Sequence, residues 1–286
     1  MKNVGLYVKR GSPKAGDVAR KASEVLERLG CTVRYDIQTA KEYSLPGGVS
    51  SREVVETSEL LVVLGGDGTF LAGAREVAQE EIPVLGINVG ALGFLTETTV
   101  NEMPKMLDLA VRGEAKTQTR TMLNAVVQHS QCAGDGCEEF RVLNDVVISK
   151  STLARIIKLR IWDGDDLITT LLADGLIVAT PTGSTAYSMA AGGPVCHPDL
   201  NAILITPICP HLLTNRPLIV PESSRIRIEV ESDDDCYVTL DGQSGTEFRS
   251  GDQVMIRKSD KPLIIMRNPQ RNYYQILRDK LQWGKR

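Results

Sequence analysis

The sequence has no apolar run that approaches the roughly 20 residues a helix needs to cross a bilayer, and its N-terminus opens on a strand pattern without the shape of a signal peptide. It also lacks net positive charge, since the formal charge of its 286 residues is -3. Nothing therefore attracts the whole chain to nucleic acid or to an anionic membrane. We expect a cytoplasmic protein with no nucleic-acid and no membrane partner, in which any anion-binding site is local.

Several common catalytic motifs are missing as well. No Gly-Lys-Ser/Thr ending of a P-loop occurs, and the dinucleotide fingerprint GxGxxG, started at Gly66, meets Leu71 where its third glycine belongs. A nucleophile elbow, a His-Glu-x-x-His metal motif and a paired-cysteine motif are also absent. The hydrolase and zinc-enzyme classes are therefore unsupported.

The six cysteines have no spacing typical of a disulfide framework, so we expect reduced thiols. His129, Cys132 and Cys137 could supply three soft metal ligands, but they lie in a Gly- and Asp-containing loop without an obvious fourth partner. We assign no metal-ligating residues, and whether this loop binds a metal is left open.

The first 115 residues alternate strands with helices. Apolar patterns predict strands at 4–8, 31–35, 60–64 and 83–88, and helices at 12–29, 70–79 and 101–112, with a short helix near 52–57 inside a polar loop at 40–58. This alternation is typical of a Rossmann-like parallel sheet covered by helices, in which ligands gather at the carboxyl ends of the strands.

Beyond Lys116 the pattern changes to short strands with few helices. Strands are predicted at 121–129, 139–149, 154–162, 167–172, 175–180, 202–207, 224–231, 236–240, 252–258 and 262–266. We expect an all-β sandwich of two sheets over residues 116–267, after an α/β domain over residues 1–115. A final amphipathic helix at 273–281 is expected to return to the first domain, so that 268–286 packs back on it.

The stretch 60–70 joins a buried strand to a helix through a glycine-rich turn. Gly65, Gly66 and Gly68 let the backbone approach a ligand closely, and Thr69 can cap the helix that follows. Free amides at a helix start suit phosphate oxygens. Asp67 would repel phosphate unless it holds Mg²⁺ or accepts a hydroxyl proton, and both roles belong to phosphoryl transfer. Taken on its own, the turn is better explained as a tight turn with a solvated aspartate.

Four further stretches are rich in turns or polar residues. The stretch 89–95 has two glycines beside Phe94. It is either a second segment whose backbone makes a close approach or a plain loop. Asn144 and Asp145 interrupt an apolar strand, and an amide beside a carboxylate suits an adenine edge and ribose hydroxyls, although an exposed bulge is the alternative. Residues 173–195 are dense in small side chains around Tyr187, which favours a flat ligand. The Asp-Gly at 241–242 by itself predicts a hairpin.

Together these stretches closely resemble the motifs of the NAD kinase family. They occur in the same order as in the family and span most of the chain. They are GGDGTFL at 65–71, NVGALGFL at 88–95, Asn-Asp at 144–145, DGLIVATPTGSTAYS at 174–188, AGGPV at 191–195 and DGQ at 241–243. The first is shared with phosphofructokinases and lipid kinases, whereas the block at 174–195 is highly specific. The resemblance implies transfer of the terminal phosphoryl of ATP, with Mg²⁺, to the 2′-hydroxyl of the adenosine ribose of NAD, which forms NADP.

The resemblance also implies roles for individual residues. Asp67 would be the catalytic carboxylate, with Gly68 against the ligand. The residues implied to hold the adenosine half are Asn144, Asp145, Thr185, Ala186 and Tyr187, with Ser188, Met189 and Ala190 completing their loop. Asp174 would reach the nicotinamide half and Arg155 the phosphates, while Phe94 and Gln243 would complete the pocket. Family members are oligomers whose β domains meet, which implies a homodimer or homotetramer.

Two positions depart from the family pattern. Many bacterial members have Asn-Glu where this chain has Asn144-Asp145, and many have a basic residue where it has Leu172. Two alternatives remain at this point: a lipid or sugar kinase that shares the glycine turn, and a non-catalytic nicotinamide nucleotide sensor. Regulation and the choices between ATP and polyphosphate, and between NAD and NADH, are not determined by the sequence.

Overall fold

The computed structural model describes residues 1–77, 81–130, 137–151, 156–231 and 236–284. It divides into two compact units. Unit 1 consists of Met1–Thr119 and Leu263–Arg286, and unit 2 consists of Arg120–Pro262. The sequence placed these two boundaries after residues 115 and 267.

Unit 1 is built on a seven-stranded sheet of order β2-β1-β3-β4-β19-β6, with β5 paired to β4 off this path. The strands are β1 Asn3–Val8, β2 Thr32–Tyr35, β3 Leu60–Gly65, β4 Val84–Asn88, β5 Thr98–Thr99, β6 Lys116–Arg120 and β19 Leu263–Arg267. The pairs of β1 with β2, β1 with β3 and β3 with β4 are parallel. All residues of β3 and β4 are buried, as expected of parallel strands covered on both faces.

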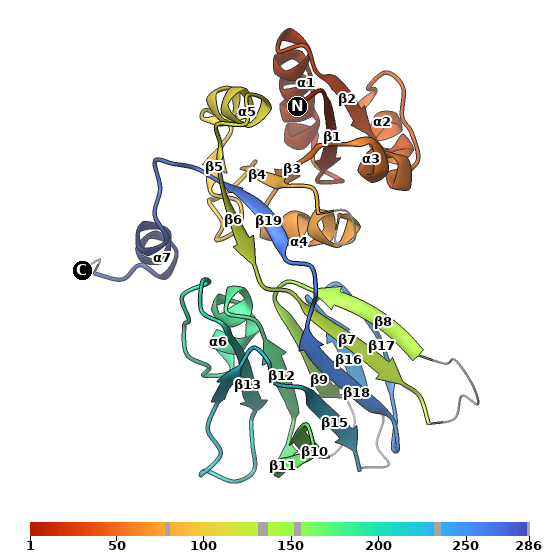
Figure 1. Ribbon diagram of the computed structural model, residues 1–286, viewed down its shortest axis with the longest axis vertical. Coiled ribbons are helices and arrows are strands. Elements are labelled where there is room, and N and C mark those ends of the chain that lie inside the picture. The colour runs from red at the N-terminus through yellow and green to blue at the C-terminus, as the bar shows by residue number, and fades with distance from the viewer. Residues whose placement is uncertain (78–80, 131–136, 152–155, 232–235, 285–286) are drawn as a thin grey trace. The chain divides into compact units, whose positions relative to one another are not determined.

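Helices cover this sheet on both faces (Figure 1). They are α1 Pro13–Arg28, α2 Ile37–Tyr43, α3 Ser51–Thr57, α4 Asp67–Glu76 and α5 Met103–Val111. The last helix, α7 Tyr273–Leu281, follows β19. Apolar residues of α1 and α5 share one core with alternate residues of β1, β3 and β4. On the other face α4 packs so closely that a Cβ added to Gly73 would lie 2.8 Å from Val63 Cγ2. The predicted α/β architecture is thus confirmed.

Two local predictions for unit 1 are wrong. The stretch predicted as a polar loop from residue 40 begins inside α2, whose first turn is capped by Asp36 through the backbone N–H groups of Gln38 and Thr39. A helix of two turns carries too little periodicity to be recognised. α4 begins at Asp67 instead of Phe70, with Gly66 as its N-cap, so Thr69 is not the cap.

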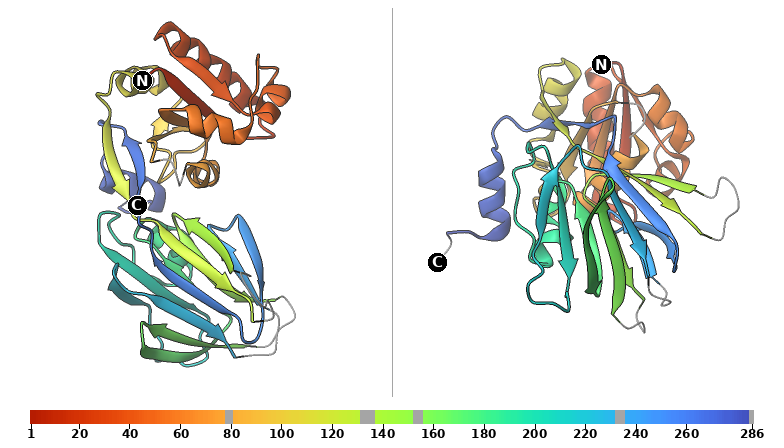
Figure 2. Two further views of the ribbon diagram at one scale, coloured as in Figure 1. Left: turned by 45° about the vertical axis from the view of Figure 1, so that its right-hand side comes forward. Right: turned by 60° about the horizontal axis from the view of Figure 1, so that its bottom comes forward.

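Unit 2 contains two six-stranded sheets, of order β11-β10-β15-β18-β7-β8 and β14-β13-β12-β9-β16-β17 (Figure 2). The strands of the first sheet are β7 Leu123–Gln128, β8 Cys137–Val142, β10 Ile157–Asp163, β11 Asp166–Ala173, β15 Ile226–Val230 and β18 Gln253–Lys258. Those of the second are β9 Asp145–Lys150, β12 Gly175–Ala179, β13 Ala202–Ile208, β14 Leu218–Pro221, β16 Cys236–Leu240 and β17 Ser244–Phe248. A short helix η1 Thr182–Thr185 and α6 Tyr187–Ala190 follow β12.

One hydrophobic core joins the inner faces of both sheets, which confirms the predicted sandwich. The alternation in β15 is confirmed as well, because Ile226, Ile228 and Val230 are buried while Arg227 and Glu229 lie on the other face. Two details differ from the prediction. The single strand expected at 139–149 is two strands, β8 and β9, in different sheets. The strand expected at 262–266 in the sandwich is β19, which pairs with β4 of unit 1.

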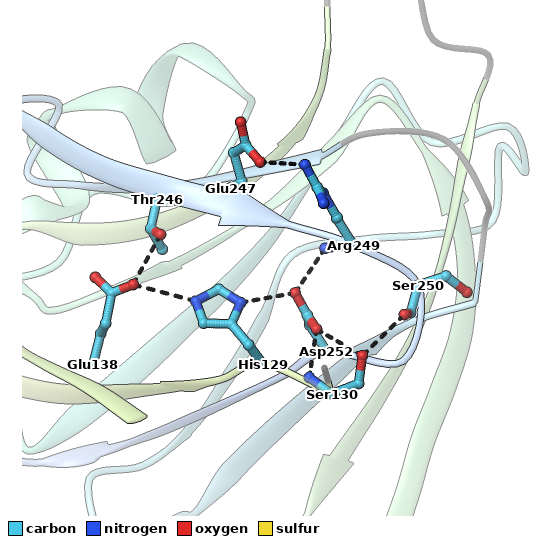
Figure 3. A network of polar contacts seen from close by, with 8 residues as sticks. All are labelled: His129, Ser130, Glu138, Thr246, Glu247, Arg249, Ser250 and Asp252. Carbon is cyan, nitrogen blue, oxygen red and sulfur yellow. Dashed lines mark hydrogen bonds and ion pairs between the residues drawn. The ribbon is translucent and has the colours of Figure 1, made fainter. Parts of the chain in front are cut away.

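His129 lies between two carboxylates at the end of β7 (Figure 3). Its Nδ1 is 3.0 Å from Asp252 Oδ2 and its Nε2 is 3.2 Å from Glu138 Oε1. Asp252 also accepts the backbone N–H groups of Ser130 and Arg249. The hydrogen bond to Asp252, followed by the one to Glu138, raises the pKa of His129 above its ordinary 6.5, against the opposing effect of burial.

We expect His129 to stabilise the fold most strongly at low pH. Because its pKa is raised in the folded protein, this stabilisation is complete below the unfolded pKa of 6.5 and is lost as pH rises through the folded pKa. The melting temperatures of the natural protein and of His129→Gln should therefore differ more at about pH 6 than at about pH 9. An equal difference at both pH values would contradict this assignment.

Candidate functional site

The turn between β3 and α4 carries the first candidate group. β3 ends at Gly65 and α4 begins at Asp67, so the strand passes into the helix through Gly66 alone. A Cβ on Gly65 would overlap the side chain of Thr69, which shows why this position accepts only glycine. The short turn places the Asp67 side chain at the first residue of the helix.

The Asp67 carboxylate is held by the segment that follows β4. Its Oδ1 accepts the backbone N–H groups of Leu95 at 3.0 Å and Thr96 at 3.1 Å, and the Thr96 hydroxyl at 3.0 Å. Its Oδ2 accepts only the N–H of Phe94, at 2.8 Å, among the residues that the structure describes. A carboxylate oxygen has room for more than one donor, so Oδ2 keeps capacity for a further hydrogen bond.

Two neighbouring residues fix this arrangement. Asn88, at the end of β4, donates from Nδ2 to Thr96 Oγ1 at 2.8 Å, and its Oδ1 accepts the N–H of Gly90. Gly93 approaches so closely that a Cβ there would overlap Asp67 Oδ1. The second glycine-rich stretch thus makes the close approach that its spacing suggested, and the group it approaches is Asp67.

Thr96→Val should separate the contribution of the Thr96 hydroxyl to stability from the contribution of the backbone amides that bind Asp67. The change removes one donor to Asp67 and leaves the buried Asn88 amide without its acceptor, which costs about 1–3 kcal/mol of unfolding free energy. Urea denaturation measures this loss. Thr98→Val is the matched control, because Thr98 Oγ1 is buried and has no hydrogen-bond partner within the described part of the chain. An equal cost for both variants would contradict the assigned role of Thr96.

A cavity of about 300 Å³ in unit 2 carries the second candidate group. It is lined by Asn144, Asp145, Val147, Ser149, Ala186, Tyr187, Thr239, Asp241 and Gly242. Tyr187 is 48% exposed, so its ring is available for stacking. The structure therefore brings together four residues that the sequence proposed for one ligand: Asn144, Asp145, Ala186 and Tyr187.

Asp241 fixes the backbone at the floor of this cavity. Its Oδ1 accepts the N–H groups of Asn144 at 2.7 Å and Asp145 at 3.2 Å, and its Oδ2 accepts the N–H of Leu143 at 3.1 Å. Asp241 and Gly242 both have positive φ, 51° and 63°, as a tight hairpin between β16 and β17 requires. The predicted hairpin is confirmed, and its aspartate also binds a neighbouring strand.

The carboxyl group of Asp145 in the cavity has an unusually high pKa, mainly because it is buried. Asp145 is 4% exposed, and desolvation, followed by the nearby charge of Asp241, raises its pKa from 3.8 to about 7. A carboxyl group in such a position is protonated in a large fraction of molecules near neutral pH. It can then donate a hydrogen bond as well as accept one.

The small residues after β12 bring η1 close to the Asn144 backbone. A Cβ on Gly183 would overlap the carbonyl oxygen of Asn144. That carbonyl accepts the N–H of Thr180 at 2.8 Å, and Thr180 Oγ1 donates to the carbonyl of Leu143. The long small-residue stretch is therefore needed for a close contact between two backbone segments beside the cavity.

The other predicted site residues lie in varied surroundings. Asp174 forms an ion pair with Lys150 at 2.7 Å, and Ser188 is fully buried against Thr206. Phe94 lies beneath Lys280 of α7, with its ring centre 5.9 Å from the ammonium nitrogen. The cavity wall does not include Thr185 of η1 or Met189 and Ala190 of α6. Gln243 follows Gly242 in the hairpin, and Gly68 is exposed in α4. Arg155 lies outside the described residues.

Asp241, Thr96 and Gly183 were not identified as site residues from the sequence. The Asp-Gly pair of the hairpin was visible, but nothing in its local pattern indicates that the side chain accepts the backbone N–H of Asn144, almost 100 positions earlier. The one signal in the sequence was the Asp-Gly pair itself, because the hairpin that it predicts gives Asp241 a positive φ, which is uncommon for a residue other than glycine.

The described residues contain no group of three or more His, Cys, Asp and Glu side chains arranged to hold a metal ion. His129 already has a carboxylate at each ring nitrogen, and Cys132 lies outside the described part of the chain. Among the described helices, none combines the length and the apolar character needed to span a membrane.

Comparison with known proteins follows the division into two units. The family model of the ATP-NAD kinase N-terminal domain matches residues 4–115, and that of the ATP-NAD kinase C-terminal domain matches residues 143–268. The chain is 41% identical to the NAD kinases of Trichlorobacter lovleyi and of Geobacter sulfurreducens, and each match covers 100% of this chain and 100% of the relative.

Two solved structures are similar over the whole chain. Yeast NADH kinase complexed with NADH gives a TM-score of 0.94 at 27% identity, covering 100% of this chain and 89% of that one. An NAD kinase from Archaeoglobus fulgidus in complex with ATP gives a TM-score of 0.78 at 25% identity, with 99% of both chains covered.

Proposed function

The chain belongs to the NAD kinase family, and on that premise we propose that its two groups of polar residues divide one reaction between them. The reaction is the transfer of the terminal phosphoryl of ATP to the 2′-hydroxyl of the adenosine ribose of NAD, which forms NADP. The observation that carries the assignment of residues is the unit 2 cavity, in which Asn144, Asp145, Ala186 and Tyr187 meet.

Asp67 is proposed as the catalytic carboxylate. Phosphoryl transfer needs little covalent help from the protein, so positioning and local charge lower the barrier. Three hydrogen bonds to Oδ1 fix the carboxylate, while Oδ2 has a single donor and can accept the proton of the attacking hydroxyl. General-base assistance of this kind is typically worth about 10²- to 10⁴-fold in rate.

The cavity of unit 2 is proposed to hold the adenosine half of NAD. Tyr187 offers a ring face to the adenine, and Asn144 and Asp145 offer an amide and a carboxyl to its polar edge and to the ribose. The volume of about 300 Å³ is within the range of small-molecule sites. Thr185, Ser188, Met189 and Ala190 shape the loop that carries Tyr187.

The remaining assignments follow the family pattern residue by residue. Gly68 lies against the ligand beside Asp67, and Phe94 and Gln243 complete the pocket. Asp174 is proposed to reach the nicotinamide half. Its carboxylate would then give up part of its contact with Lys150 and contact the ligand instead. Arg155 is proposed to contact the phosphates.

Mg²⁺ is proposed to arrive with the phosphates of ATP. This ion usually keeps several waters and takes one or two protein carboxylates, so the lack of a three-residue metal group among the described residues is compatible with it. Asp67 is the side chain that could contribute an oxygen. Bound Mg²⁺ would offset negative charge on the phosphates, while the protein positions the acceptor.

Oligomerisation and compartment are also proposals. Relatives of this chain are full-length matches, and we propose the homodimer or homotetramer that the family resemblance implies, acting in the cytoplasm. Size-exclusion chromatography with light scattering distinguishes the two assemblies.

A matrix of donors and acceptors tests the proposed function. Purified protein with Mg²⁺ is incubated with ATP or polyphosphate and with NAD, NADH, diacylglycerol or a sugar phosphate, and products are identified by mass. We expect NADP from ATP and NAD. Phosphorylation of the lipid or sugar alone would favour a related kinase, and NAD binding without any turnover would favour a nucleotide sensor.

A further inference from the structure

Two buried carboxyl groups face the same cavity in unit 2. Asp145 is 4% exposed and Asp241 is 6% exposed, and both line the 300 Å³ cavity. Two like charges this close in a buried site cannot both be ionised without a large cost in free energy. The environments of the two groups therefore decide which one keeps its proton.

Asp241 has the environment of an ionised carboxylate. It accepts three backbone N–H groups, those of Leu143, Asn144 and Asp145, which favours the charged form. Asp145 has the opposite environment, because its carboxyl group has no hydrogen-bond partner among the described residues although it is almost fully buried. An uncompensated buried charge at Asp145 is thus the less stable alternative.

We propose that Asp241 is a positioning residue of the nucleotide site: it anchors the backbone of residues 143–145 and keeps Asp145 protonated, so that Asp145 meets the adenosine as a hydrogen-bond donor. This inference deepens the proposed function and rests on it. The ligand atom that receives the bond is a nitrogen of the adenine or an oxygen of the ribose. A carboxylate at Asp145 would instead need a donor from the ligand.

The other titratable groups of the surrounding elements do not reverse this assignment. Tyr187 of α6 lines the cavity and brings no cationic side chain to it. Lys150 lies at the far end of β9 and is paired with Asp174. Asp241 is therefore the charge that acts on Asp145, and together with burial it raises the pKa of Asp145 to about 7.

The pH dependence of NAD binding tests the inference. Isothermal titration of the full-length protein with NAD, without phosphoryl donor, is carried out between about pH 6 and 8.5 in buffers of different ionisation enthalpy. NAD itself does not change charge in this range. If the protonated form of Asp145 binds, affinity should fall by up to about tenfold for each pH unit above about 7, with proton uptake on binding.

Two variants locate the proton. Asp145→Asn carries an amide that donates at every pH, so its NAD affinity should be flat with pH and its binding should take up no proton. Asp241→Asn removes the charge that opposes ionisation of Asp145, so the fall in NAD affinity should begin at lower pH. If Asp241→Asn does not fold, the comparison of the natural protein with Asp145→Asn still decides the question.

Asp252→Asn is the matched control. Asp252 is a buried carboxylate of the same unit that also accepts backbone N–H groups, but it does not line the cavity. It should leave the pH dependence of NAD binding unchanged. NAD binding by the natural protein that is independent of pH and takes up no proton would overturn this inference alone. No NAD binding at any pH would overturn the proposed function and the inference with it.

Discussion

Asp67→Asn should lower kcat by about 10²- to 10⁴-fold and leave the Kd for NAD within a few-fold of its natural value. The amide cannot accept the proton of the attacking hydroxyl at Oδ2. It can keep its oxygen at the position where Leu95, Thr96 and the Thr96 hydroxyl now donate. The segment around Asp67 should therefore stay in place, and the loss should appear in the chemical step.

Steady-state kinetics and NAD titration of the same preparation measure the two quantities. The control is Asp36→Asn, because Asp36 is a buried carboxylate of unit 1 that accepts the N–H groups of Gln38 and Thr39 and the Thr39 hydroxyl. It has the same kind of contacts without a proposed part in the reaction, so kcat should change little. A near-natural rate for Asp67→Asn would remove Asp67 from the chemistry.

Gly183→Ala should lower kcat/KM for NAD on the order of 10²-fold. The new methyl group would overlap the carbonyl oxygen of Asn144, and this backbone contact cannot be relieved by rotating a side chain. The Asn144-Asp145 segment must then shift, and a displacement of about 1 Å in a positioned site is sufficient for a loss of this size. The overlap also adds about 1–3 kcal/mol of packing strain, which thermal unfolding reports.

Gly245→Ala is the control for strain alone. Its methyl group would lie 2.6 Å from the carbonyl oxygen of Val238, on the edge strand β17, and Gly245 does not line the cavity. We expect a similar loss of stability but a much smaller change in kcat/KM. If both variants lose NAD kinase activity in proportion to their loss of stability, Gly183 has no specific role in the site.

The sequence predicted those parts of the fold that local patterns encode. β3 and β4 are buried on both faces, so they appear as uninterrupted apolar runs. The hairpin at Asp241-Gly242 was visible because two successive residues with positive φ require such a pair. The amphipathic pattern predicted α7 with its correct bounds, and in the structure a capping box at Asn272 fixes the start of this helix.

Contacts between distant segments could not be predicted in the same way. The apolar pattern of β19 suits a strand in either unit, and only its pairing with β4 places it in unit 1. The motif at 88–95 suggested a second approach to the ligand, whereas its backbone amides bind Asp67 itself. Likewise, the carboxylate of Asp241 accepts three backbone amides of the segment 143–145, and no local pattern encodes a contact between positions so far apart.

The most direct test of the account is a structure of the protein with NAD and a non-hydrolysable ATP analogue. The measurement is the distance from the Asp67 carboxylate to each ribose hydroxyl of the adenosine half. The account predicts the 2′-oxygen at about 2.6–3.2 Å, with the adenine against Tyr187. A bound NAD whose 2′-hydroxyl is far from Asp67 while another acidic side chain contacts it would contradict the account.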